Sequence, residues 1–215
     1  MPVPLKIDFV SDISCPWCVI GLRALEQAIA RLDGQVAVDL HFQPFELNPQ
    51  MPPGGQDIDE HLQQKYGSTP EQAALVRERI RAAGAALGFT FSLQTRSRIY
   101  NTFDAHRLLH WAALEGHQLA LKQALFQAYF TDGEDPSNHQ VLIRAAARVG
   151  LDATRAARIL DSNEFAAVVR KEQAFFQDQG IHAVPAVIIN NQHLIQGGQP
   201  VEVFEQALRQ IAGLA

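Results

Sequence analysis

Residues 14 to 19 read Ser-Cys-Pro-Trp-Cys-Val, and this stretch holds the only two cysteines in a chain of 215 residues. Upstream, residues 5–10 alternate between apolar and polar side chains, with Lys6 and Asp8 on the polar side, which is the period of a strand. Downstream, apolar residues recur at helical spacing over 19–32 until Asp33-Gly34 ends the pattern. We therefore expect a Cys-x-x-Cys motif that enters a helix directly from a strand.

Cys15, at the beginning of that helix, has the position of a nucleophile. Free backbone N–H groups and the positive end of the helix dipole favour a thiolate there. Pro16 suits the first helical turn because it fixes φ and has no N–H to leave unpaired. Cys18 lies on the same helical face and can act as the resolving thiol that breaks a mixed disulfide at Cys15. Trp17 either supplies apolar surface beside the sulfur or packs internally.

Two other interpretations of the cysteine pair are weaker. A disulfide across so short a loop would restrict the unfolded chain little, since the entropic gain grows with loop length. A zinc site needs two more ligands, for which His106 and His110 are the candidates, being four residues apart on a predicted helix. We expect these histidines to make surface or inter-domain hydrogen bonds instead, and we predict no metal. His182 is expected to be structural or to lie near the thiols.

The periodicity of the sequence changes twice after the cysteine motif. Residues 36–42 alternate as a second strand, and a proline-rich segment follows. Residues 57–179 are predicted to be helical throughout, with an N-cap, a proline and a reciprocal capping residue at 69–72. Residues 186–195 form a predicted β-hairpin with a left-handed turn at Asn190-Asn191, and Pro200 opens a last helix.

This order of elements predicts an α/β domain that is interrupted by a helical one. The outer pieces, 1–53 and 180–215, are each too small to fold well separately, but together they can form a small mixed sheet with flanking helices. Residues 54–179 would then form the helical insertion domain.

The composition and charge of the chain argue against two classes of binding partner, nucleic acid and membranes. The net charge is −5 and no run of Lys or Arg is long enough to form a basic stripe, which argues against nucleic acid. Lys6 and Asp8 interrupt the apolar N-terminus, so a secretory signal is not expected, and no segment approaches the ~20 apolar residues that span a bilayer. We expect a cytoplasmic protein without a membrane partner, and in a reducing cytosol a close cysteine pair is more often catalytic or metal-binding than permanently oxidised.

Four stretches of the sequence resemble the DsbA branch of the thioredoxin superfamily, and within it the FrnE-type group of bacterial DsbA-family oxidoreductases. They are residues 12–18, residues 44–49 with Met51-Pro52, residues 101–108, and Val184-Pro185. The resemblance implies a thioredoxin-like α/β fold, with an all-helical domain inserted between the N-terminal strand-helix-strand and the C-terminal hairpin-helix.

The resemblance also implies roles for individual residues. Cys15 would be the attacking thiol, Cys18 the resolving one, and Pro185 a cis-proline that faces them. The backbone of Val184 would pair with a substrate peptide, so that Pro16, Trp17, Val184 and Pro185 bind substrate beneath a cap formed by the insertion. Periplasmic DsbA proteins carry histidine where this chain has Trp17, and losing that potential positive charge argues against strong oxidising power.

The layout is similar to two further families, the kappa-class glutathione transferases and the 2-hydroxychromene-2-carboxylate isomerases. These typically have serine where this chain has Cys15. In that reading Asn101, Asp104 and Arg107 would line a glutathione pocket, whereas the alternative is that they are polar residues between helices.

Two residues before the motif have open roles. Ser14 either donates a hydrogen bond to the sulfur or caps the turn into the helix. Asp12 either opposes thiolate formation by its charge or caps the same turn.

We predict an enzyme, a thiol–disulfide oxidoreductase that exchanges disulfides with protein substrates through Cys15 and Cys18. It would need no cofactor beyond this dithiol, with glutathione or a thioredoxin-type reductant as co-substrate. The alternative is a glutathione-dependent isomerase or transferase.

Overall fold

A four-stranded mixed sheet lies at the centre of the computed structural model, which describes residues 1–92 and 97–214. Its strand order is β2-β1-β5-β6. β1 runs parallel to β2 and antiparallel to β5, and β5 pairs with β6 in a hairpin. The strands are β1 (Val3–Ser11), β2 (Val36–Pro44), β5 (Ala186–Ile189) and β6 (His193–Gln196).

Helices make up most of the remaining described chain. They are α1 (Pro16–Arg31), α2 (Ile58–Tyr66), α3 (Pro70–Ala86), α4 (Phe103–Leu114), α5 (Gln118–Phe126), the π-helical η1 (Gln127–Thr131), α6 (His139–Arg148), α7 (Ala153–Leu160), α8 (Ala166–Asp178) and α9 (Val201–Ile211). Within the described ranges, none of them is both long and apolar enough to cross a membrane.

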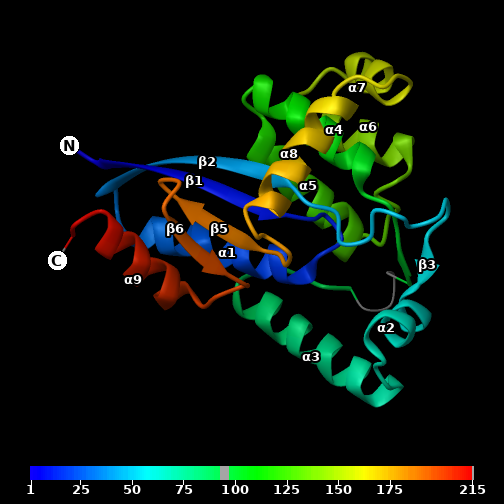
Figure 1. The fold of residues 1–215 in the computed structure, drawn as a ribbon, viewed down its shortest axis with the longest axis horizontal. Coiled ribbons are helices and arrows are strands. Elements are labelled where there is room, and N and C mark those ends of the chain that lie inside the picture. Colours follow the sequence, from blue (N-terminus) through cyan, green and yellow to red (C-terminus); the bar gives the residue numbers. More distant parts are fainter. Residues whose placement is uncertain (93–96, 215) are drawn as a thin grey trace.

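Two groups of helices pack against the sheet, and α2 and α3 belong to neither (Figure 1). α1 and α9 pack against each other on one side, where the apolar residues of both helices are buried. α4, α5 and α8 contact β2 from the other group, and α2 and α3 form a separate lobe at the bottom of the view. The sheet is therefore covered by the first and last helices, α1 and α9, and by α4, α5 and α8 of the insertion.

The strands of the predicted N-terminal strand-helix-strand and of the predicted C-terminal hairpin form one sheet, as expected from the sequence. β1 pairs with β5 across the whole length of the intervening chain, so that Ile7 lies opposite Ile189. Asn190 and Asn191 both have positive φ, 53° and 56°, which is the left-handed turn expected of the hairpin. The capping box of Thr69 and Gln72 is also present at the beginning of α3.

Residues 93–96 of the range predicted to be helical throughout, 57–179, lie outside the described residues, and within the described part a pair of short strands contradicts the prediction. Gln56–Asp57 (β3) pairs antiparallel with Arg98–Ile99 (β4) to form a two-stranded ladder beside α2. Gly55 makes this pairing feasible, because a Cβ at that position would lie 2.2 Å from the carbonyl oxygen of Ile99. The insertion is thus not all-helical, and its division from the sheet domain at 53/54 and 179/180 stays a prediction.

The polar side of β1 also differs from expectation. Asp8 was placed on a polar face together with Lys6, yet it is buried, with 3% of its surface exposed. Gln43 on β2 donates a 2.6 Å hydrogen bond to it, and the Lys6 ammonium lies 2.9 Å from its carboxylate. The alternation of apolar and polar residues identified the strand correctly. It could not show that both faces of the second half of β1 are buried.

α1 approaches the loop before β5 very closely at Gly21. A Cβ at Gly21 would lie 3.0 Å from Cγ of Pro185 and 3.4 Å from Cα of Gly198. A Cβ at Gly198 would in turn lie 2.9 Å from the carbonyl oxygen of Trp17. The absence of side chains at both glycines therefore lets the first turns of α1 lie against the segment that carries Pro185.

We expect Gly21→Val to lower the free energy of unfolding by about 1–3 kcal/mol, because the added atoms overpack the contact with Pro185. Ala30→Val, at an exposed position on the same helix, is the matched control. It should lower the free energy of unfolding by only about 0.5 kcal/mol, the difference in helix propensity between alanine and valine. Urea unfolding of both variants measures the difference, and equal losses would contradict the close approach.

Candidate active site

The two cysteines lie where β1 passes into α1. Cys15 is the N-cap residue, with extended backbone (φ −93°, ψ 112°), and Pro16 occupies the first helical turn. The backbone N–H of Cys18 donates to the carbonyl of Cys15 at 3.1 Å. Both side chains are free thiols, with exposed fractions of 3% for Cys15 and 0% for Cys18. Both cysteines are therefore buried, and only Cys15 keeps a small exposed surface.

The Val184-Pro185 segment faces the first of these sulfurs. The peptide bond between Val184 and Pro185 is cis. The Cys15 thiol donates to the carbonyl oxygen of Val184, with 3.6 Å between Sγ and oxygen. The carbonyl of Pro185 accepts from the N–H of Gly197 at 2.8 Å, which holds the segment to the residue that follows β6. Residues that are 169 positions apart in sequence are thus in contact at the thiol.

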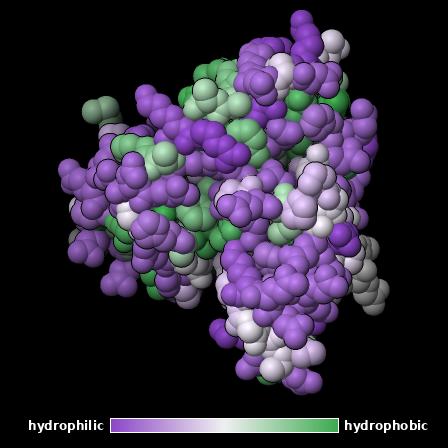
Figure 2. Space-filling view, turned by 45° about the vertical axis from the view of Figure 1, so that its right-hand side comes forward, coloured by the Kyte–Doolittle hydropathy of each residue, from purple (hydrophilic) through white to green (hydrophobic). Residues whose placement is uncertain are grey.

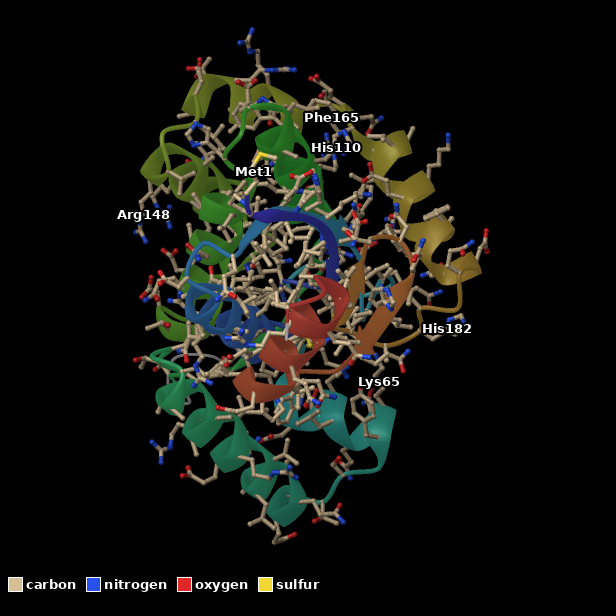
Figure 3. All side chains as sticks on the ribbon, turned by 90° about the vertical axis from the view of Figure 1, so that its left-hand side faces the viewer. Met1, Lys65, His110, Arg148, Phe165 and His182 are labelled. Atoms are coloured by element: carbon tan, nitrogen blue, oxygen red, sulfur yellow. The ribbon has the colours of Figure 1, made fainter. Side chains whose placement is uncertain are left out.

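A large cavity of about 1020 Å³ opens beside Cys15, and we call it the front cavity. Its inner wall includes Pro16, Trp17 and Val184, and its outer wall comes from α2 and α3. Figure 3 shows Lys65 of α2 and His182 of the segment before β5 on the same side of the molecule, and both line this cavity. Figure 2 shows apolar surface in the recess between the lower lobe and the rest of the molecule.

Apolar side chains of the α2–α3 lobe are exposed toward this space. Tyr66 and Val76 line the front cavity with 59% and 44% of their surface exposed. Burial, followed by the charge of Cys15, raises the pKa of the Tyr66 phenol. The lobe therefore gives the cavity a mixed wall, in which Tyr66 and Val76 lie together with charged residues such as Lys65 and Arg77.

Asp12 lies directly behind the dithiol and is completely buried. Its carboxylate accepts hydrogen bonds from the Ser14 hydroxyl at 2.9 Å, the Leu47 N–H at 2.7 Å and the Thr102 hydroxyl at 2.7 Å. The Ser14 N–H adds a fourth at 3.2 Å, and Nε2 of His106 lies 3.6 Å from Oδ1. One carboxylate therefore joins β1, the segment after β2 and the beginning of α4.

These partners decide the ionisation of Asp12. Burial alone would raise its pKa, but the facing His106 ring, the Leu47 N–H and the Thr102 hydroxyl outweigh burial and lower the pKa to about 2. Asp12 is accordingly a carboxylate at every physiological pH.

Cys18 has the opposite tendency. Burial, together with the hydrogen bond and the charge of Cys15, raises its pKa well above the ordinary value of 9.0. The nearby Lys122 and the Asp12 backbone lower it by less. Cys18 is therefore a thiol at neutral pH in the reduced protein.

A second buried carboxylate fixes the segment after β2. Glu46 pairs with Arg170 of α8 and accepts a 3.0 Å hydrogen bond from Gln173. Arg170 stacks on the ring of Phe103, with 3.7 Å between its guanidinium carbon and the ring centroid. Glu46 also lines the front cavity, so α8 and α4 hold its wall in place.

Several predicted residues have structural roles in this arrangement. The Ser14 hydroxyl donates to the Asp12 carboxylate, and the Asp12 carboxylate also accepts from the Ser14 N–H, so it is Asp12 that closes the turn before α1. Asn101 bonds to Glu46 and Pro49, and Arg107 bonds to Asp104 and to the carbonyl of Glu164. As far as the described residues show, the front cavity is not lined by Asn101, Asp104 or Arg107.

The two candidate zinc ligands point to different partners. His106 faces Asp12, whereas Nδ1 of His110 lies 3.3 Å from Glu172. Figure 3 shows His110 next to Phe165, and their ring centroids are 5.2 Å apart. No group of three or more His, Cys, Asp or Glu side chains suited to a metal ion is found in residues 1–92 and 97–214. His182, by contrast, lies at the front cavity with Cys15.

The sequence did not identify three residues near the dithiol that lie on helices of the insertion. Lys122, Tyr66 and Val76 lie in the range predicted only to be helical, and none of them was assigned a role. A lysine at an apolar position of a helical stripe was the available signal for Lys122. Nothing in the local sequence marks the walls of a cavity.

The family model of the DSBA-like thioredoxin domain matches residues 6–209 of this chain. The chain belongs to the DSBA-like thioredoxin domain family. The match extends from β1 to α9, so it includes the dithiol, the Val184-Pro185 segment and the whole insertion. The predicted thioredoxin-like fold is thereby confirmed, and family membership supports thiol–disulfide oxidoreductase chemistry in general.

Individual relatives agree with this assignment. A probable DsbA oxidoreductase from Streptomyces coelicolor, SCO1869, has a similar crystal structure, with a TM-score of 0.91, 32% identity, and coverage of 98% of this chain and 91% of that one. Uncharacterized protein YwbO of Bacillus subtilis is 27% identical over 97% of this chain and 96% of its own length. The cytosolic disulfide reductase DsbM of Pseudomonas aeruginosa, solved with GSH, shares the fold, with a TM-score of 0.67, 18% identity, and coverage of 97% and 100%.

We expect iodoacetamide to modify Cys15 and to leave Cys18 unmodified in the folded, reduced protein. Cys15 lines a cavity of about 1020 Å³, whereas Cys18 has no exposed surface and a raised pKa. Mass spectrometry should find one adduct on Cys15 in buffer and two adducts in urea. Modification of Cys18 at a comparable rate in buffer would contradict the geometry.

Asp12→Asn should destabilise the protein in a pH-dependent way. A pKa lowered from 3.8 to about 2 contributes about 2 kcal/mol, which is present above about pH 4 and is lost as the pH falls through about 2. The difference in unfolding free energy between wild type and variant should therefore shrink by about that amount between pH 5 and pH 2.

Urea unfolding at several pH values measures this difference. Asp39→Asn, at an exposed carboxyl on β2, serves as the control and should give a small, nearly constant difference. A pH-independent effect of Asp12→Asn would show that the Asp12 carboxyl is not held ionised.

Proposed function

We propose that this protein is a cytoplasmic enzyme that exchanges disulfides with protein substrates through Cys15 and Cys18. The observation that carries the proposal is the position of the Cys15 thiol. It lies at the N-terminus of α1, against the Val184 carbonyl and at the wall of a large open cavity, while Cys18 is buried one helical turn behind it. An exchange of disulfides needs one accessible sulfur and one sheltered resolving sulfur at this spacing.

The proposed reaction has two steps in the reducing direction. The Cys15 thiolate attacks a substrate disulfide, forms a mixed disulfide and releases one substrate thiolate. Cys18 then attacks Cys15, the Cys15–Cys18 disulfide forms, and the second substrate thiolate leaves. The oxidising direction is the reverse, and no cofactor beyond the dithiol is required for either.

Substrate binding is proposed for Pro16, Trp17, Val184 and Pro185. The Val184 carbonyl beside Cys15 is a backbone acceptor that an extended peptide can use, in the manner of strand addition. Trp17 contributes apolar surface to the same wall, and Tyr66 and Val76 face it across the front cavity. We expect disulfides flanked by apolar residues to be preferred.

Recycling is proposed to use glutathione or a thioredoxin-type reductant. DsbM, which shares the fold, is named a cytosolic disulfide reductase and was solved with GSH, which supports both the compartment and the co-substrate. We propose no nucleic-acid partner.

The second candidate is a glutathione-dependent isomerase or transferase. The volume of the front cavity favours it, since about 1020 Å³ is sufficient for a tripeptide and a small molecule together. Saturable glutathione binding, together with an activity that survives Cys18→Ser, would support this candidate.

The test is the reduction of insulin disulfides with dithiothreitol as the electron source. Wild type should accelerate the reaction, and Cys15→Ser should fall to the dithiothreitol background because the attacking sulfur is missing. Cys18→Ser, the matched control, should instead accumulate a mixed disulfide between Cys15 and the substrate, detected by non-reducing electrophoresis.

A wild-type rate equal to the background would count against general disulfide exchange. An active Cys15→Ser variant would show that Cys15 is not the nucleophile.

A further inference from the structure

Lys122 of α5 is a lysine whose charged end lies inside the protein. None of its surface is exposed. Its ammonium nitrogen lies 5.0 Å from the ring centroid of Phe126 and 5.8 Å from that of Phe42, and among residues 1–92 and 97–214 it has no hydrogen-bond partner. Aromatic faces compensate a buried ammonium only in part, so its three N–H donors need a further partner.

The position of Lys122 follows from the contact between α5 and β2. The side-chain amide of Gln118 makes two hydrogen bonds to the backbone of Phe42, each of 2.9 Å, one as acceptor and one as donor. This pair fixes the first turn of α5 against β2, and Lys122 lies one turn further along α5. The backbone of Lys122 is therefore held beside β2.

A cavity of about 150 Å³ lies against Lys122, and we call it the rear cavity. It shares no lining residue with the front cavity. Figure 3 shows His110, which lines the rear cavity, well above Lys65, which lines the front one. The lining of the rear cavity extends from the fully buried Lys122 to Leu114, which has 67% of its surface exposed. The rear cavity is therefore a recess that runs from the surface to a buried cation.

The other polar side chains of this lining already have partners within the described residues. The pairs are His41 with Asp39, Gln43 with Asp8, Gln118 with the backbone of Phe42, and His110 with Glu172. Nε2 of His106 also lacks a hydrogen bond, but it lies 3.6 Å from Oδ1 of Asp12 and is attracted to that carboxylate. Within the described part of the lining, the Lys122 ammonium is thus the charged group that remains without a partner.

The charge of Lys122 decides which kind of ligand fits the recess. Water could accept hydrogen bonds from the ammonium, but it would leave the positive charge uncompensated among apolar side chains such as Phe42 and Leu109. An anion supplies both an acceptor and the opposite charge. The volume of about 150 Å³ also exceeds the room for one water molecule, which needs about 10–15 Å³.

The protonation of Lys122 agrees with an anionic ligand. Burial lowers its pKa to about 8, whereas the charges of Cys18, Asp12 and Cys15 act in the opposite direction. The side chain is therefore still mainly an ammonium at pH 7, which is the form that attracts an anion.

The neighbouring carboxylates limit the charge of the ligand. Asp12 lies beside the His106 ring, and Glu172 lines the recess with 31% of its side chain exposed. Both would repel a second negative charge on the ligand, while one negative charge is balanced by the ammonium. Phe42 and Phe126 beside the ammonium also favour an ion that loses its water easily, because burial of a charge in apolar surroundings costs its hydration.

We propose that the rear cavity binds a small monovalent anion, which accepts a hydrogen bond from the buried Lys122 ammonium. This site lies apart from the front cavity, and its occupation does not depend on the proposed disulfide exchange. No bond is made or broken in the protein.

The direct test is crystallography with sodium bromide, because bromide scatters anomalously. Crystals of wild type soaked in bromide should show an anomalous peak in the rear cavity, in contact with the Lys122 ammonium. Crystals of Lys122→Met, which removes the charge and keeps a side chain of similar length, should lack this peak. An adventitious ion only, bound at exposed lysines while the rear cavity holds water or nothing, would overturn the proposal.

Thermal unfolding tests the same site in solution. Replacing sodium sulfate by sodium bromide at constant ionic strength should change the Tm of wild type and of Lys122→Met differently. In bromide the change should favour wild type by about 2–4 °C. Lys171→Met, at an exposed position on α8, is the matched control and should respond as wild type does.

The remaining outcomes also decide the question. Equal responses of wild type and Lys122→Met to bromide would overturn the proposal. If Lys122→Met does not fold, the wild-type crystal decides, since a rear cavity without bromide contradicts the site. Neither measurement involves disulfide exchange, so a negative result would leave the proposed function unaffected.

Discussion

The buried carboxylate of Asp12 is the interaction on which the site depends. A charge without solvent is tolerated only when donors surround it, and the donors of Asp12 come from three separate parts of the chain, at Ser14, Leu47 and Thr102. Satisfying this one group brings together the end of β1, the segment after β2 and the beginning of α4. The cysteine motif begins three residues later, so the same constraint places the insertion over the dithiol.

Asp12 and Lys122 are two buried charged groups with different surroundings. Asp12 is saturated with hydrogen bonds and is held ionised, which makes it an anchor. Lys122 has no such partners, and burial brings its pKa to about 8, where it can gain and lose a proton near neutral pH. Asp12 is thus satisfied by hydrogen bonds, whereas the Lys122 ammonium lies near the aromatic rings of Phe126 and Phe42.

Much of the fold could be predicted because its signals are local. The alternation in β1, the capping box at Thr69 and Gln72 and the left-handed pair Asn190-Asn191 each depend on neighbours within a few residues. The cysteine motif was recognisable for the same reason. The burial of Asp8, the β3–β4 pairing and the environment of Lys122 depend on segments far away in sequence, which no local period reveals. The walls of the front cavity were unpredictable on the same grounds, since α2 and α3 meet the dithiol only in three dimensions.

The ionisation of Asp12 is the central claim, and its side-chain carbon resonance, followed by NMR against pH in the reduced protein, tests it most directly. The account predicts one titration at about pH 2 and a carboxylate that stays ionised through neutral pH. A titration near neutral pH would contradict it, because the hydrogen bonds from Ser14, Leu47 and Thr102 would then not hold the Asp12 carboxyl ionised.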